Sequence, residues 1–129
     1  MRYDESVNPQ SLEPEHRPLY EVKANLFKGL AHPVRVRVLE LLAAGDEVAV
    51  SDLLADTGLE PSHLSQHLAV LRRHGLVSSE RRASQVYYRL AHSEVAEFLA
   101  VARRLLVEVL DDMRRQLDAT ATLPPVGRS

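Results

Sequence analysis

Apolar residues recur at helical spacing in the first third of the chain. A first helix is predicted over about residues 18–30, because four apolar residues fall three or four positions apart: Leu19, Val22, Leu26 and Leu30. Proline suits the first turn of a helix and disfavours helix in the residue before it, so a second helix is predicted from Pro33 to about Ala44. We expect its Arg35 and Arg37 to be solvated. Its inward face is predicted to consist of Val34, Val38, Leu41 and Leu42.

Two shorter patterns follow and predict a helix-turn-helix. Residues 48–50 are too few for more than a single bridging strand, and Ser51 is predicted to cap a short helix over residues 52–57. Gly58 then turns the chain into a longer amphipathic helix over about residues 61–74. The inward stripe of this helix is Leu64, Leu68 and Leu71. Its exposed start carries polar side chains that can reach DNA base edges: Ser62, His63, Ser65, Gln66 and His67.

A two-stranded hairpin is predicted directly after that helix. Residues 76–82 and 85–90 alternate in polarity and are rich in Val and Tyr, with Ala83 and Ser84 at the tip. A helix-turn-helix followed by such a hairpin is a winged helix-turn-helix. The expected fold class is therefore mainly α with a small β-wing.

The last helix, over about residues 93–118, has an apolar stripe broader than one neighbour needs. At about 1.5 Å per residue, a helix of roughly 26 residues spans about 39 Å, longer than a domain of this size is wide. We therefore expect a homodimer built from the first and last helices. Its predicted interface residues are Leu19, Tyr20, Val22, Leu26, Phe27, Phe98, Leu99, Ala102, Leu105, Leu106, Val109 and Met113.

Composition indicates one ordinary globular domain, with 45% hydrophobic and 26% charged residues in a chain of 129. The domain is predicted over residues 19–118, between a flexible arm at 1–18 and a flexible tail at 119–129. The sequence contains no run of 18 apolar residues and no secretory signal pattern. We therefore expect no membrane association and a cytoplasmic location.

The net charge of −2 does not exclude DNA as the partner, because charge is unevenly placed. Residues 58–90 hold five arginines against two glutamates, a local net charge of +3. Charges act locally, since the Debye length is about 8 Å in physiological salt. Double-stranded DNA is thus the expected partner. The predicted contacts are Ser62, His63, Ser65, Gln66, His67, Arg72, Arg81, Arg82, Ser84 and Gln85.

Catalytic patterns are weak in this sequence. His63 and His67 have the spacing of two zinc ligands on a helix, but Leu64 stands where a metalloprotease needs a glutamate base. The sequence has no Gly-x-Ser-x-Gly elbow, phosphate loop or dinucleotide motif. We therefore expect no enzymatic activity and no cofactor.

A site for a hard cation on the last helix is an alternative. Its ligands would be Glu108, Asp111 and Asp112, or His92 together with acidic residues across a dimer. Arg104 lies four residues before Glu108, and this spacing predicts an ordinary helical ion pair. Arg115 lies four residues after Asp111 and predicts another. No metal site is predicted on this basis.

Several motifs occur in order and resemble the ArsR family of winged-helix repressors: Leu30-Ala31-His32-Pro33-Val34-Arg35, Leu64-Ser65-Gln66-His67-Leu68, Gly75-Leu76-Val77 and Val86-Tyr87-Tyr88-Arg89-Leu90. The resemblance covers about residues 19–115 and implies a dimeric repressor that binds an imperfect palindromic operator. Leu19-Tyr20, Phe27-Lys28 and Ala100-Val101-Ala102-Arg103 resemble actinobacterial members associated with hypoxia and formate-hydrogenlyase regulation.

The sequence departs from this family at its best-known sensor. Where the family has Glu-Leu-Cys-Val-Cys-Asp-Leu, residues 47–53 carry Ala49 and Ser51, and the chain has no cysteine at all. Soft metals and arsenite need thiolates, so sensing of that kind is excluded. The wing tip also differs, because Ala83 and Ser84 replace the usual Gly and Lys or Arg. The effector is unknown, and two alternatives stay open: a metal-responsive repressor with His, Asp or Glu ligands, or a winged-helix protein-interaction module.

Overall fold

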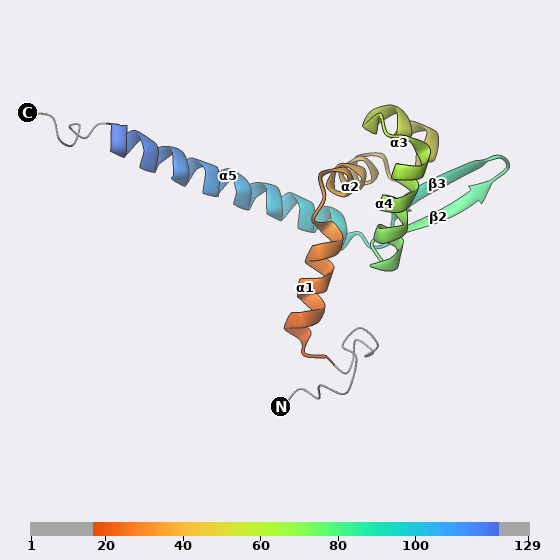
Figure 1. The fold of residues 1–129 in the computed structure, drawn as a ribbon, viewed down its shortest axis with the longest axis horizontal. Coiled ribbons are helices and arrows are strands. Elements are labelled where there is room, and N and C mark those ends of the chain that lie inside the picture. The colour runs from red at the N-terminus through yellow and green to blue at the C-terminus, as the bar shows by residue number, and fades with distance from the viewer. Residues whose placement is uncertain (1–16, 122–129) are drawn as a thin grey trace, which may run out of the picture.

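The computed structural model describes residues 17–121, and these form five helices and three short strands (Figure 1). Residues 1–16 and 122–129, which hold most of the predicted arm and tail, lie outside the described part. The elements in chain order are α1 Leu19–Leu30, α2 Pro33–Gly45, β1 Val48–Ala49, α3 Val50–Thr57, α4 Pro61–Arg73, β2 Val77–Arg82, β3 Gln85–Leu90 and α5 Glu94–Ala121.

The core lies between α2, α3, α4 and the sheet. Its fully buried side chains are Val38, Leu39, Leu42, Leu53, Leu64 and Leu71. The prediction for α2 was correct for Val38 and Leu42, while Val34 and Leu41 are partly buried around this core. Leu39 was missed by the pattern, because α2 contacts α3, α4, β3 and α5 and so buries more than one face.

The three strands form an antiparallel sheet in the order β1-β3-β2. The predicted bridging strand is confirmed at Val48 and Ala49, which pair with Tyr88 and Tyr87 of β3. Strands β2 and β3 form the predicted wing, which Figure 1 shows extending away from the helices. At its tip Ala83 adopts a φ of 55°, a left-handed conformation that costs alanine more than glycine.

Two predicted helix ends are wrong. Helix α3 begins at Val50 without a side-chain cap, so Ser51 lies in its first turn and does not cap it. The reason is that Ala49 is still paired in β1, and the chain passes directly from strand to helix. Helix α5 continues past Asp118 to Ala121, since alanine favours helix and the first proline lies beyond this point.

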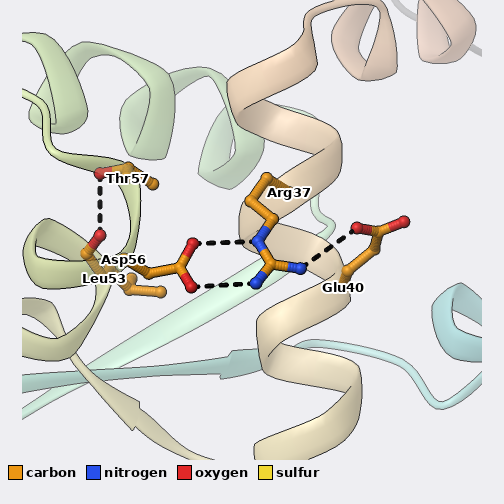
Figure 2. A network of polar contacts seen from close by, with 5 residues as sticks. All are labelled: Arg37, Glu40, Leu53, Asp56 and Thr57. Atoms are coloured by element: carbon orange, nitrogen blue, oxygen red, sulfur yellow. Dashed lines mark hydrogen bonds and ion pairs between the residues drawn. The ribbon is translucent and has the colours of Figure 1, made fainter.

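Arg37 is not simply solvated, as predicted, but joins α2 to α3. Figure 2 shows its guanidinium between two carboxylates: Nε and Nη2 donate to the two oxygens of Asp56, both at 2.9 Å, and Nη1 lies 3.7 Å from Glu40. The hydrogen bond from Arg37 lowers the pKa of Asp56 below its usual value. The Thr57 hydroxyl donates to the Leu53 carbonyl at 2.8 Å and ties down the end of α3.

Truncating Leu39 should destabilise the fold strongly, because its side chain is fully buried. For Leu39→Ala we expect a loss of about 2–5 kcal/mol in the free energy of unfolding, from lost burial and a cavity. The matched control Leu39→Met keeps the volume and should cost less than about 1.5 kcal/mol. Urea denaturation followed by circular dichroism measures both. Equal stabilities for the two variants would contradict this account of the core.

Candidate nucleic-acid interface

The start of α4 presents a polar face because its opposite face is buried. Gly58 adopts a φ of 69°, which turns the chain between α3 and α4, and Pro61 occupies the first turn of α4. Three leucines, Leu64, Leu68 and Leu71, point into the core. Four of the five predicted reading residues are exposed on the other side: Ser62, His63, Ser65 and Gln66.

His67 is the exception, because the structure packs it against the start of α2. Its ring centroid lies 4.2 Å from that of His32, and its Nδ1 lies 3.3 Å from Nη1 of Arg35. Burial lowers the pKa of His67, and the nearby His32 and Arg35 lower it further. Arg35 was predicted to be solvated and is instead part-buried in this contact. The helical pattern alone could not show that α2 lies beside this position.

The wing carries cations that are partly engaged within the chain. Nη2 of Arg82 lies 2.5 Å from Oε1 of Glu47, and its guanidinium carbon stands 4.1 Å above the ring centre of Tyr87. The hydrogen bond to Glu47 raises the pKa of Arg82. The Arg82 charge is thus shared with Glu47 and, at 3.9 Å, with Glu80, while about half of the side chain is exposed, so a phosphate would compete with these carboxylates. Arg81 is exposed beside it.

Arg72 also has an internal partner. Its Nη1 donates to the hydroxyl of Tyr88, and its guanidinium carbon lies 5.8 Å from the centre of the Tyr88 ring. This contact joins the last turn of α4 to β3. Arg72 therefore links the predicted reading helix to the wing, a contact that the sequence pattern did not indicate.

A hollow of about 550 Å³ lies between α3, α4 and the wing. Three predicted DNA-contacting residues line it together with Ser51: Ser65, Ser84 and Gln85. Residues separated by about twenty positions in the sequence thus line one hollow, whose other walls are mostly apolar side chains such as Leu54, Leu64 and Val86. This hollow surface extends from α4 to the wing tip. A winged helix presents such a surface to a DNA duplex.

Helices α1 and α5 carry many exposed apolar side chains. Phe27 and Phe98 stack with ring centroids 6.2 Å apart and join the two helices. Of the predicted interface residues, Leu26 and Leu99 pack partly against the core, Val22 is half-buried, and the rest are exposed. Four further exposed apolar residues of α5 were not predicted: Val101, Val107, Leu110 and Leu117. Leu110 and Leu117 continue the helical spacing of the apolar stripe, so the sequence pattern could have predicted these two residues.

The acidic residues of α5 do not form a metal cluster. Asp112 pairs with Arg115, three residues on, so the expected pairing of Arg115 with Asp111 is wrong. Across residues 17–121, no three His, Asp or Glu side chains are grouped as metal ligands. In the same part of the chain, no helix combines the length and apolar character needed to cross a membrane.

Comparison with known proteins gives a consistent result. Residues 32–79 match the sequence profile of the arsR family of bacterial regulatory proteins. An uncharacterized HTH-type transcriptional regulator of Mycobacterium tuberculosis, Rv0081, is 50% identical over 98 residues, which cover 76% of this chain and 86% of that protein. A biofilm growth-associated repressor of Xylella fastidiosa is 36% identical over 96 residues, covering 74% of this chain and 82% of the repressor.

Solved structures agree with the sequence matches. The crystal structure of Rv0081 superposes with a TM-score of 0.71 at 50% identity, covering 75% of this chain and 97% of that one. The homodimeric winged helix-turn-helix DNA-binding domain of Mb0332 from Mycobacterium bovis superposes with a TM-score of 0.67 at 30% identity, covering 81% and 95% of the two chains. These neighbours confirm the fold class: mainly helical, with a small antiparallel sheet as the wing.

Glu47 should limit how strongly the wing binds DNA, because it pairs with Arg82. We expect Glu47→Gln to raise DNA affinity and to steepen the dependence of log Kd on log salt by up to about 0.9, the contribution of one added phosphate contact. Fluorescence anisotropy at several salt concentrations measures both. The control Glu40→Gln, which removes a carboxylate beside Arg37, should leave the slope unchanged.

The double variant Glu47→Gln/Arg82→Gln distinguishes two explanations for tighter binding. Either Arg82 is released to contact a phosphate, or the loss of the Glu47 charge reduces its repulsion of DNA. If Arg82 is responsible, the added slope disappears in the double variant. A slope that stays steep without Arg82 would contradict the exchange of Glu47 for phosphate.

Proposed function

The chain belongs to the arsR family of bacterial regulatory proteins, and from this premise we propose that it is a homodimeric repressor of an imperfect palindromic operator. One observation carries the proposal: the polar start of α4 is exposed beside the wing, while its leucine stripe is buried. The family and the named relatives are transcriptional regulators, which supports a role in regulation and not in catalysis. The proposed place of action is the cytoplasm, where bacterial DNA lies.

We assign base reading to the exposed start of α4. A helix in the major groove contacts base edges with its first residues, and glutamine can form two hydrogen bonds with adenine. Gln66 is the proposed specific contact, and Ser62, His63 and Ser65 are permissive neighbours. Arg81 at the wing and Arg82, once released from Glu47, would hold phosphates, which orient the protein without reading sequence.

Dimerisation through α1 and α5 is proposed from the apolar surface of these helices. Exposed side chains such as Leu105 at 62% and Leu117 at 69% leave a continuous stripe without a partner in the single chain. The stripe begins at Val95, which is buried in the core. The face of α5 that packs on the domain at its first turn therefore continues as the exposed apolar stripe farther along the helix. The homodimeric state of the Mb0332 domain supports a second copy as the partner. Two reading helices would then enter successive major grooves about 34–36 Å apart.

The effector of this regulator is not sensed by cysteine thiolates, because Ala49 and Ser51 stand where the family has its cysteines. We propose that arsenite and soft metals are not effectors. The identity of 50% to a Mycobacterium tuberculosis protein supports the proposed actinobacterial subgroup. A hard or borderline metal stays an alternative effector, and a panel of metals with EDTA in the DNA-binding assay tests it.

DNA binding distinguishes a repressor from an interaction module. With duplexes from the region upstream of its own gene, we expect affinity to fall steeply between about 50 and 200 mM salt, as phosphate contacts require. Gln66→Ala should lose about 1–3 kcal/mol at one base position and relax preference there. Anisotropy on a panel of operator variants measures this. No binding to any duplex at low salt would favour an interaction module, and an unchanged base preference would contradict the role of Gln66.

The dimer surface can be tested at two adjacent positions of α5. Leu106 lies on the apolar stripe, whereas Val107 lies about 100° around the helix, on the side of Arg103 and Arg114. We expect Leu106→Glu to yield monomers in sedimentation velocity, because it places a charge in the interface, and to weaken operator binding. The control Val107→Glu should stay dimeric. Equal behaviour of the two variants would contradict the proposed interface.

A further inference from the structure

The end of α1, the start of α2 and the middle of α4 meet at one guanidinium. Nε of Arg35 donates to the Gly29 carbonyl at 2.7 Å, and Nη2 donates to the Lys28 carbonyl at 3.2 Å, which satisfies the end of α1. Nη1 of the same side chain lies 3.3 Å from Nδ1 of His67 on α4. We name His32, Arg35 and His67 the Arg35 junction.

The hydrogen-bond partners of the two histidines require an acceptor at each Nδ1. Arginine has only donors, so Nδ1 of His67 must accept and carries no proton. Nδ1 of His32 likewise accepts from the backbone N–H of Val34 at 3.1 Å and caps α2. Both rings are therefore neutral in this arrangement. Adding a proton to either Nδ1 removes an acceptor that its partner uses.

The charges around His67 are all of one sign. On its own helix it faces His63, and from the start of α2 it faces His32 and Arg35. His74 at the end of α4 is also close to Arg35, as well as to Arg73, and the pKa of His74 is lowered, mainly by burial. Among the described residues, no carboxylate contributes to the lowered pKa of His67. Protonation of His67 thus places a positive charge beside Arg35 with no acid to balance it.

The junction lies between the two surfaces that a repressor must couple. Helix α1 carries Tyr20 and Phe27 of the proposed dimer surface, and α4 carries the reading face. The two helices meet closely, because a Cβ built at Gly29 would lie 2.5 Å from the His74 ring. A change in the junction therefore acts on the angle between the dimer surface and the reading helix.

We propose that Arg35, held by neutral His67 and by the His32-capped start of α2, is a positioning residue for the reading helix, and that protonation of these histidines weakens operator binding. This rests on the proposed DNA-binding function and adds a regulation to it. Protonation removes the acceptors at Nδ1 of His32 and of His67. Arg35 then keeps only its hydrogen bonds to the carbonyls at the end of α1, and the added positive charge repels Arg35 at the contact with α4.

The test compares operator Kd at pH 7.5 and pH 5.5 within each protein, so that differences in basal affinity cancel. His67→Asn keeps an acceptor near the Nδ1 position, and His32→Asn keeps a helix cap, but neither side chain titrates. For the unaltered chain we expect Kd to rise about fivefold on acidification, because a difference of one pKa unit between bound and free protein sets an upper limit of about tenfold that pH 5.5 does not reach. The ratio should fall below about twofold in the double variant His32→Asn/His67→Asn.

The control is His92→Asn, which changes an exposed histidine two residues before α5 and should keep the full pH ratio. Thermal unfolding and sedimentation at both pH values separate positioning from loss of fold or dimer. The proposal is overturned if the ratio is the same in the unaltered chain and the double variant, or if acid unfolds both alike.

A second readout does not depend on DNA. The backbone amide of Val34 donates to His32, so its NMR shift should move with pH in the unaltered chain and not in His32→Asn. If no duplex binds at either pH, the proposed repressor function fails while this titration still decides the junction. A Val34 amide that is insensitive to pH in the unaltered chain overturns it.

Discussion

The burial of one leucine stripe on α4 determines what the rest of the molecule can do. Leu64, Leu68 and Leu71 are almost fully buried, and each contributes about 1.5–3 kcal/mol by leaving water. A helix that buries this stripe must present the polar residues between the leucines to solvent. The rotation of α4 about its axis, and hence the set of side chains that it exposes, therefore follows from core packing. The residues proposed to read DNA are those that the hydrophobic core leaves on the surface.

Around this helix, arginines act first as structural connectors. Arg37 joins α2 to α3, Arg35 joins α1 to α4, and Arg72 joins α4 to β3. Each connects two elements through its charged end, which reaches a polar partner on the second element. These contacts add to the packing of α2, α3, α4 and β3, which holds the helices and the wing together. Such contacts are sensitive to charge, which makes them suitable points of control.

The sequence predicted the fold well where periodicity decides it. The stripe of α4, the hairpin at Ala83 and Ser84, and the long α5 all follow from the spacing of apolar residues. Contacts that a tertiary neighbour decides could not be predicted in this way. His67 packs against His32 at the start of α2, and Arg82 pairs with Glu47, far away in sequence, while the DNA contacts of both residues stay predictions. No local pattern contains that information, because both partners come from other elements.

The central claim is that two copies of this chain read one operator with two α4 helices a single helical turn apart. Hydroxyl-radical footprinting of the operator, combined with the stoichiometry of the complex, tests it most directly. The account predicts two protected regions centred about 10 base pairs apart on an imperfect palindrome, with two chains bound per duplex. Protection of a single half-site by one chain, with no protection on the symmetric side, would contradict it.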